Sequence, residues 1–228
     1  MCFSKEDEQN LIERYTRRYN EFGYNPKSLG WDKGKQEIRF DVLTSHYNFE
    51  NKKVLDIGCG FGDLNITLNQ KTTKYFYTGI DLVESLLTEA MQRFTGENIE
   101  FIMANVLEFK SEKIFDYAIS SGIFNHKLAD GNNYDFIEAV IEKSFLLVKD
   151  GIAFDFLSEK VDYRLEHTFH SSPEKILSIA YKFSRNVILR NDYMPFEFSV
   201  FILKDESFNK EDTVFTQFKS RKNNDSFL

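Results

Sequence analysis

The sequence predicts one α/β fold: a Rossmann-like, seven-stranded, mostly parallel sheet with helices on both faces and an N-terminal helical cap. Three observations predict this class. Apolar runs typical of buried strands alternate along the chain with amphipathic runs of helical period. A turn with three alternating glycines joins the first of these strands to a helix. The last two strand-like runs, 186–189 and 196–203, are separated by a short turn, which is typical of an antiparallel pair.

Length and composition limit the classes of protein. The 228 residues suffice for a cap (1–50), a core (51–203) and a C-terminal tail packed on the core (204–228). A net charge of −7 without a basic face disfavours a nucleic-acid partner. Two cysteines form no disulfide framework, and no zinc spacing occurs, so we expect no metal. Without a signal core or a spanning apolar run, we expect a cytoplasmic protein with no membrane partner.

The cap is predicted as two helices joined by a loop. Ser4 followed by acidic residues is typical of a helix start, and Gly23 is typical of a helix end. A second helix should turn Ile38, Val42 and Leu43 inward. We expect both helices to lie over the nucleotide-binding fold.

The glycine turn predicts a nucleotide-type cradle. Gly58, Gly60 and Gly62 stand between the buried strand 54–57 and the helical run 64–68. Glycine is needed where the backbone takes a positive φ or approaches a ligand closely. The free N–H groups of a helix start then attract a nucleotide-like ligand. A tight turn that binds nothing would have the same glycines.

The second strand, 74–81, ends in an acid. Asp81 lies 19 residues after Gly62, close to the ~20-residue spacing of a ribose-binding carboxylate. A carboxylate suits this role because it can accept hydrogen bonds from both hydroxyls of one ribose. Asp81 could also cap the following helix.

The motif Asp56-x-Gly58-x-Gly60-x-Gly62, together with Asp81, resembles the class I S-adenosylmethionine-dependent methyltransferases of small-molecule type. The similarity extends from about residue 54 to 203. It implies that S-adenosyl-L-methionine is the cofactor, that Asp56 lies near its methionine amino group and that Asp81 binds its ribose. The implied cofactor contacts are Asp56, Gly58, Cys59, Gly60, Asp81, Leu82, Asn105, Val106 and Ser120, with Trp31 and Arg39 from the cap.

Three of these assignments have alternatives. Asn105 stands where the family often has an acid that accepts from the adenine amino group; its side-chain carbonyl can accept the same bond, or it is an ordinary loop residue. Trp31 either anchors the cap or helps to close it over the cofactor. Arg39, like Lys33, either meets the methionine carboxylate or is solvated.

Two other classes of protein would contain a similar glycine turn. An NAD-dependent dehydrogenase needs Gly or Ala where this chain has Asp63, and it usually needs a second domain, which we do not expect in this sequence. A non-catalytic regulator that binds S-adenosylmethionine or a nucleotide would keep the turn and lack an acceptor pocket.

The segment 120–126 follows the fourth strand and should face the transferable methyl group, because parallel sheets bind ligands beyond their C-terminal ends. It lacks the Pro-Pro motif of nucleic-acid amino-methyltransferases. His126 is the candidate catalytic base for an acceptor hydroxyl, or it is a hydrogen-bonded loop histidine.

A small-molecule acceptor should meet the loop 159–172 and the turn 190–195. Its expected contacts are Asn125, Tyr163, Arg164, His167, His170, Arg190 and Tyr193. The cations among them suit a phosphorylated or nucleotide-activated acceptor. A faint similarity to methyltransferases of bacterial surface-polysaccharide precursors, sugars and phosphoramidates among them, points the same way. The sequence indicates no oligomeric state.

Overall fold

The computed structural model describes residues 3–30, 35–129, 131–205, 213–215 and 218. Within these residues, seven strands form one sheet in the order β3-β2-β1-β4-β5-β7-β6. The strands are β1 (Lys52–Ile57), β2 (Tyr75–Asp81), β3 (Ile99–Met103), β4 (Phe115–Ser120), β5 (Val148–Leu157), β6 (Asn186–Arg190) and β7 (Glu197–Leu203). The helices are α1 (Lys5–Phe22), the short 3-10 helix η1 (Pro26–Leu29), α2 (Gln36–Thr44), α3 (Leu64–Lys71), α4 (Glu84–Arg93), α5 (Asn133–Leu147) and α6 (Pro173–Ala180).

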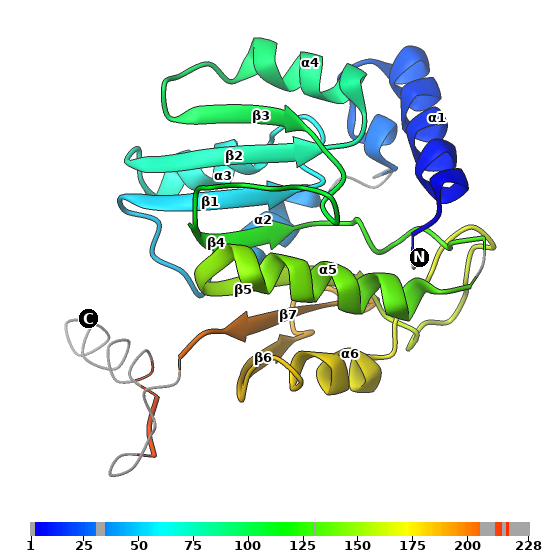
Figure 1. Cartoon of the computed structure of the whole chain (residues 1–228). Coiled ribbons are helices and arrows are strands. Elements are labelled where there is room, and N and C mark those ends of the chain that lie inside the picture. The colour runs from blue at the N-terminus through cyan, green and yellow to red at the C-terminus, as the bar shows by residue number, and fades with distance from the viewer. Residues whose placement is uncertain (1–2, 31–34, 130, 206–212, 216–217, 219–228) are drawn as a thin grey trace.

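The strand directions confirm the predicted class. The first five strands pair in parallel, and β7 runs antiparallel to both β5 and β6. The predicted closing pair is therefore present. Because the parallel strands run in one direction, their C-terminal ends meet at one edge of the sheet, and α1 stands across that edge (Figure 1).

Each face of the sheet has its own apolar core. On one face, Leu43 of α2 and Leu64 of α3 pack with Val54 of β1. On the other face, Ile137 of α5 packs with Leu55 of the same strand. Since successive side chains of a strand point to opposite faces, the apolar run in β1 supplies both cores, as a central parallel strand requires.

The N-terminal segment divides into two parts. Ser4 caps α1 by accepting a hydrogen bond from the Asp7 amide at 3.0 Å, and the helix ends at Gly23, as predicted. Helix α1 packs on η1 and α4. Helix α2, which we expected over the fold with α1, instead packs on α3, β5 and β7 and so covers a face of the sheet. Val42 is buried, whereas Ile38 is 39% exposed and its predicted inward orientation is wrong.

No helix of the described ranges is both long and apolar enough to cross a membrane.

Candidate active site

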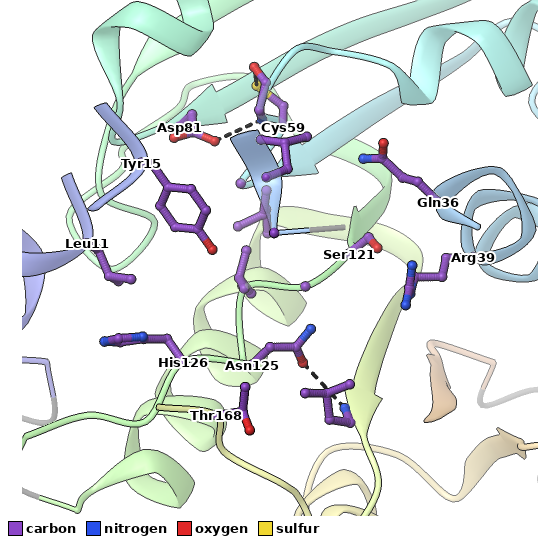
Figure 2. Close-up of a pocket in the computed structure, with 18 of the residues that line it drawn as sticks. Leu11, Tyr15, Gln36, Arg39, Cys59, Asp81, Ser121, Asn125, His126 and Thr168 are labelled. Carbon is purple, nitrogen blue, oxygen red and sulfur yellow. Dashed lines mark hydrogen bonds between the residues drawn. The ribbon is translucent and has the colours of Figure 1, made fainter. Parts of the chain in front are cut away.

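A cavity of about 650 Å³ lies at the edge where the parallel strands end. That volume is within the usual range for small-molecule sites. Its wall is built from α1, the glycine turn after β1, the loops that follow β2 to β5, and the connection from β6 to β7. Figure 2 shows Tyr15, Asp81, Ser121, Asn125 and His126 arranged around it. The topology thus gathers side chains from distant parts of the sequence into one chamber.

The glycine turn forms part of this wall, and its backbone requires glycine. Gly58, Gly60 and Gly62 have φ values of 68°, 53° and 74°. A Cβ on Gly58 would lie 2.2 Å from a side-chain carbon of Ile123, and one on Gly60 would lie 3.2 Å from Leu29. The turn is therefore pressed between two side chains that line the cavity, and it leaves its backbone facing the chamber.

Asp56 is a buried carboxylate in the cavity wall. The Tyr77 hydroxyl donates a hydrogen bond to its Oδ2 at 2.7 Å. Burial raises the pKa of Asp56 to about 7; the charges of Asp81 and Asp63 act in the same direction, and the Tyr77 hydrogen bond opposes them. A cation that arrived at this carboxylate would favour its ionised form.

Asp81 ends β2 and organises the turn opposite it. Its Oδ2 accepts from the Gly60 amide at 2.8 Å and its Oδ1 accepts from the Val83 amide at 2.9 Å. Burial raises the pKa of this carboxyl, while the backbone hydrogen bonds lower it. Each carboxylate oxygen can accept a further bond, so Asp81 both fixes the turn and retains acceptor capacity toward the cavity. The two roles considered for it are compatible.

Leu82, Asn105 and Val106 line the next part of the wall. The Asn105 side chain already has two partners: its Nδ2 donates to Glu8 of α1 at 2.7 Å, and its Oδ1 accepts from the Leu107 amide at 3.0 Å. The amide therefore links α1 to the loop after β3. An adenine contact through Asn105 would use the second lone pair of its carbonyl.

Ser120 does not reach the cavity, contrary to our expectation. It is buried within β4, and its hydroxyl donates to the Ile57 carbonyl at 2.6 Å. The next residue, Ser121, lines the cavity instead. Asp155 of β5 accepts from the Ser121 hydroxyl at 2.5 Å and from the Gly122 amide at 2.7 Å, so a buried carboxylate anchors the start of this loop.

Asn125 and His126 continue the loop after β4 and line the cavity, as predicted. The Asn125 Oδ1 accepts from the Leu157 amide at 3.4 Å, and the backbone of His126 bridges to Thr168. The His126 ring makes no hydrogen bond with any residue that the structure describes, and it extends toward α1 on the side of Leu11 (Figure 2). A histidine without such a partner is free to exchange a proton with a ligand.

Local charges act on the His126 ring. Burial lowers its pKa below the usual value near 6.5. The nearby charges of Arg14 and His167 lower it further, and Asp7 opposes them. The neutral imidazole, the form that can accept a proton, therefore predominates at neutral pH.

Arg39 lines the cavity from α2, but its charge is already paired. Its Nε donates to Glu197 of β7 at 2.6 Å, its Nη2 donates to the same carboxylate, and its Nε lies 4.0 Å from Asp155. The contact that we expected between Arg39 and the cofactor carboxylate stays a prediction. Trp31 and Lys33 lie outside the described residues.

The loop after β5 reaches the cavity with some of the expected residues only. Tyr163, His167 and His170 line it. Both ring nitrogens of His170 are engaged, with the Ser158 carbonyl and the Thr168 hydroxyl. Arg164 lies outside the wall and donates to the Glu159 carbonyl. Among the described residues, no group of three or more His, Cys, Asp or Glu side chains is suited to a metal ion.

Arg190 and Tyr193 also lie outside the cavity wall. Arg190 pairs with Asp192 at 2.9 Å, and the Tyr193 hydroxyl bonds Ser199 at 2.8 Å. The β6–β7 connection does reach the cavity, as expected, but through Met194, Pro195 and Phe196. An arginine two residues before an acid satisfies itself locally, which explains this difference.

Sequence reasoning missed the contribution of α1. Leu11, Arg14, Tyr15 and Arg18 line the cavity, and the Tyr15 hydroxyl points into it (Figure 2). Their spacing of three and four residues marks one helical face. The available signal was that two arginines share this face with the apolar residues.

Comparison with known proteins identifies the family. Residues 48–198 match a family model described as a methyltransferase domain. A protein of Mycobacterium tuberculosis named as a methyltransferase is 30% identical over 155 residues, which cover 65% of this chain and 91% of that protein. A ubiquinone biosynthesis O-methyltransferase of Rickettsia canadensis is 30% identical over 93 residues, covering 40% of this chain and 39% of that enzyme. A protein of Geobacillus sp. that is also named as a methyltransferase is 31% identical over 129 residues, covering 53% of this chain and 47% of that protein.

Solved structures share the fold. A magnesium protoporphyrin IX methyltransferase from Synechocystis, with bound S-adenosylhomocysteine, aligns with a TM-score of 0.62 at 16% identity over 86% of this chain and 95% of that one. A Burkholderia thailandensis 1,6-didemethyltoxoflavin-N1-methyltransferase aligns with a TM-score of 0.64 at 17% identity, over 88% of this chain and 90% of that one. Because the family model spans well over half of a chain with this topology and glycine turn, the chain belongs to the class I S-adenosylmethionine-dependent methyltransferases.

Proposed function

We propose that this enzyme transfers the methyl group of S-adenosylmethionine to an oxygen atom of a small molecule, with His126 as the general base. One observation carries the proposal. The ring of His126 lines the same cavity as the glycine turn and makes no hydrogen bond with a described residue, although it is partly buried. A half-buried imidazole without a structural partner suits proton transfer better than a scaffolding role.

The residues present fit the cofactor. Positive-φ glycines leave the backbone of the turn bare toward the cavity. The buried carboxylate of Asp56 would hold the amino group of the cofactor's methionine moiety, and Asp81 would hold its ribose hydroxyls. Leu82 and Val106 supply apolar surface for a purine ring. When bound, the cofactor supplies an electrophilic methyl group on a sulfonium.

The chain's own residues then position and deprotonate the acceptor. An oxygen nucleophile attacks the methyl carbon, its O–H proton passes to the His126 imidazole, and the carbon–sulfur bond breaks with its electrons remaining on sulfur. Asp155 anchors the loop that carries His126 through Ser121 and Gly122. Alignment of donor and acceptor by such a fixed loop can contribute several powers of ten in rate.

The shape of the acceptor end favours a compact, partly apolar molecule. Where we place the acceptor, the wall comes from the end of β5, the loop after it and the β6–β7 connection, with Leu157, Val161, Leu165, Met194 and Phe196. A chamber lying under α1 suits a small acceptor better than a nucleic acid, and the net charge of −7 supports the same choice. The narrower expectations stay predictions: a precursor of a bacterial surface polysaccharide as the acceptor, and a cytoplasmic location.

The test uses labelled S-adenosylmethionine with the purified chain and a bacterial small-molecule extract. We expect label in an alkali-stable, extractable product, formed by the parent and formed at least about 100-fold more slowly by His126→Ala. Calorimetry with S-adenosylmethionine should give the same affinity for both proteins. Cofactor binding without transfer to any extract component would contradict the proposed activity and support a non-catalytic regulator.

A further inference from the structure

We propose that the acceptor bears an oxyanion, a carboxylate or a phosphate, and that Arg14 of α1 and His167 of the loop after β5 bind it beside His126. This inference rests on the proposed function, because it places the acceptor at the end of the cavity that contains His126. It names the chemical class of the acceptor and the residues that select it.

Arg14 is placed for such a contact. It lies on the face of α1 that lines the cavity, one turn from Leu11. Its guanidinium forms no ion pair with any residue of the described ranges. The other arginine on this face, Arg18, donates to the Lys27 carbonyl of η1, so it is held by the helix that follows. Within the described structure, Arg14 is therefore a cavity-lining cation of α1 that is available to a ligand.

His167 lines the same cavity from the loop after β5. Its carbonyl accepts from the Lys127 amide at 3.1 Å, and Thr168 bridges to His126, so the two loops run side by side. Both His167 and His126 line the cavity. The charges of Arg14 and His167 both act on the His126 ring, which places the three side chains in one electrostatic neighbourhood.

Asp7 is the acid whose charge acts on His126. Asp7 lies two turns before Arg14 on α1 and is buried. Its Oδ1 accepts from the Ala129 amide at 2.9 Å and its Oδ2 accepts from the Ser4 hydroxyl at 2.8 Å. The carboxylate is thus committed to fixing the start of α1 against the loop after β4. Asp7 therefore forms no ion pair with Arg14, although the whole chain is acidic.

An oxyanion is the ligand chemistry that this arrangement selects. Arginine presents a planar fork that binds carboxylate or phosphate, and a neighbouring imidazole adds a donor. An oxyanion beside Arg14 would also offset the positive charge that now lowers the pKa of His126. The base would therefore become stronger when the acceptor is in place.

The first experiment uses inorganic phosphate and acetate as probes on the full chain saturated with S-adenosylhomocysteine. The imidazole resonances of His126 and His167 are followed by NMR during each titration. We expect a saturable shift of both resonances and a rise in the pKa of His126. His46, which does not line the cavity, acts as the internal reference.

Two arginine variants decide which cation is responsible. Arg14→Gln should weaken probe binding about tenfold or more, whereas Arg17→Gln, an exposed position on the same helix, should leave it unchanged. Equal probe binding by Arg14→Gln and the parent would overturn the proposal. So would a loss of S-adenosylhomocysteine affinity in Arg14→Gln, because it would assign Arg14 to the cofactor.

The second experiment separates the acceptor sources. The small-molecule extract is divided by ion exchange, and methyl transfer from labelled S-adenosylmethionine is measured with each fraction. We expect transfer in the anionic fraction; prior phosphatase treatment abolishes it for a phosphate and leaves it intact for a carboxylate. Transfer confined to the neutral or cationic fraction refutes the oxyanion while leaving the methyltransferase activity established.

Discussion

The two ends of the cavity are built on opposite principles. At the cofactor end, the polar groups are buried and hydrogen-bonded within the chain: Asp56 to Tyr77, and Asp81 to the amides of Gly60 and Val83. At the acceptor end, the ring of His126 lacks such partners within the described structure, and His167 is exposed. A pre-organised end suits a ligand common to a whole family, whereas an open end can be adapted to one acceptor.

The largest effect is expected from a substitution that removes the proposed catalytic base and leaves the cofactor end unchanged. His126→Ala should lower turnover by about 10²- to 10⁴-fold with cofactor affinity intact, because it removes the proton acceptor. In the parent, the rate should rise with pH through a group whose pKa lies below the usual 6.5 of histidine, and the variant should lose that limb. If His126→Ala raises only the KM for the acceptor and keeps the pH limb, His126 positions the acceptor and is not the base.

The second-largest effect is expected from a substitution that disturbs the cofactor end alone. Gly60→Val should lower S-adenosylmethionine affinity by about 100-fold or more, because a branched side chain at φ 53° would strain the turn and press against Leu29 of the cavity wall. Gly131→Val is the matched control: its φ is 71°, and a Cβ there would meet nothing within 4 Å. Calorimetry on both variants, with circular dichroism for folding, compares the two. Similar losses in both would show that strain alone is responsible.

A smaller effect should come from the acid that ends β2. Asp81→Ala removes an ionised acceptor, worth about 1.5–3 kcal/mol, so cofactor affinity should fall roughly 10- to 150-fold. Asp116→Ala is a control at the opposite end of the sheet, where that carboxylate accepts from the Lys53 amide and pairs with Lys52. Unchanged affinity in a folded Asp81→Ala variant would place the ribose elsewhere.

The same contrast explains what the sequence could predict. The mostly parallel sheet, the closing antiparallel pair and the cavity positions of Gly58, Gly60 and Asp81 follow from local patterns: apolar runs, glycine spacing and a strand-end acid. Each of these patterns lies within a few residues of the feature it predicts.

The acceptor end depends on contacts between distant segments, which local patterns do not encode. Arg190 was expected near the acceptor, but it pairs with Asp192 two residues away. Arg39 was expected to be available to the cofactor, but Glu197, far along the chain, binds it. Arg14 was missed because a helix in isolation does not reveal which element its face will meet. Charges in loops and caps therefore needed the structure for their assignment.

The smallest expected effect is a pH dependence of cofactor binding that belongs to Asp56. Its pKa of about 7 means that the free protein holds this carboxyl mostly protonated at pH 6 and mostly ionised at pH 8. Since the ionised form would bind the amino group of the cofactor, affinity should rise about tenfold from pH 6 to pH 8. Calorimetry across this range measures it, and Asp56→Asn should show a weaker affinity that does not change with pH.

Stability should change in the opposite direction, which separates this effect from unfolding. The folded state keeps a proton on Asp56 up to about pH 7, whereas the unfolded chain releases it near the usual 3.8. The folded state therefore binds more protons between about pH 4 and pH 7, and the Asp56 contribution to the free energy of unfolding is lost as pH rises through that window. Urea titrations of the parent and Asp56→Asn isolate this contribution from those of Asp63 and Asp155, whose pKa values are also raised, to about 6. Affinity that falls together with stability as pH rises would show that Asp56 does not meet the cofactor's amino group.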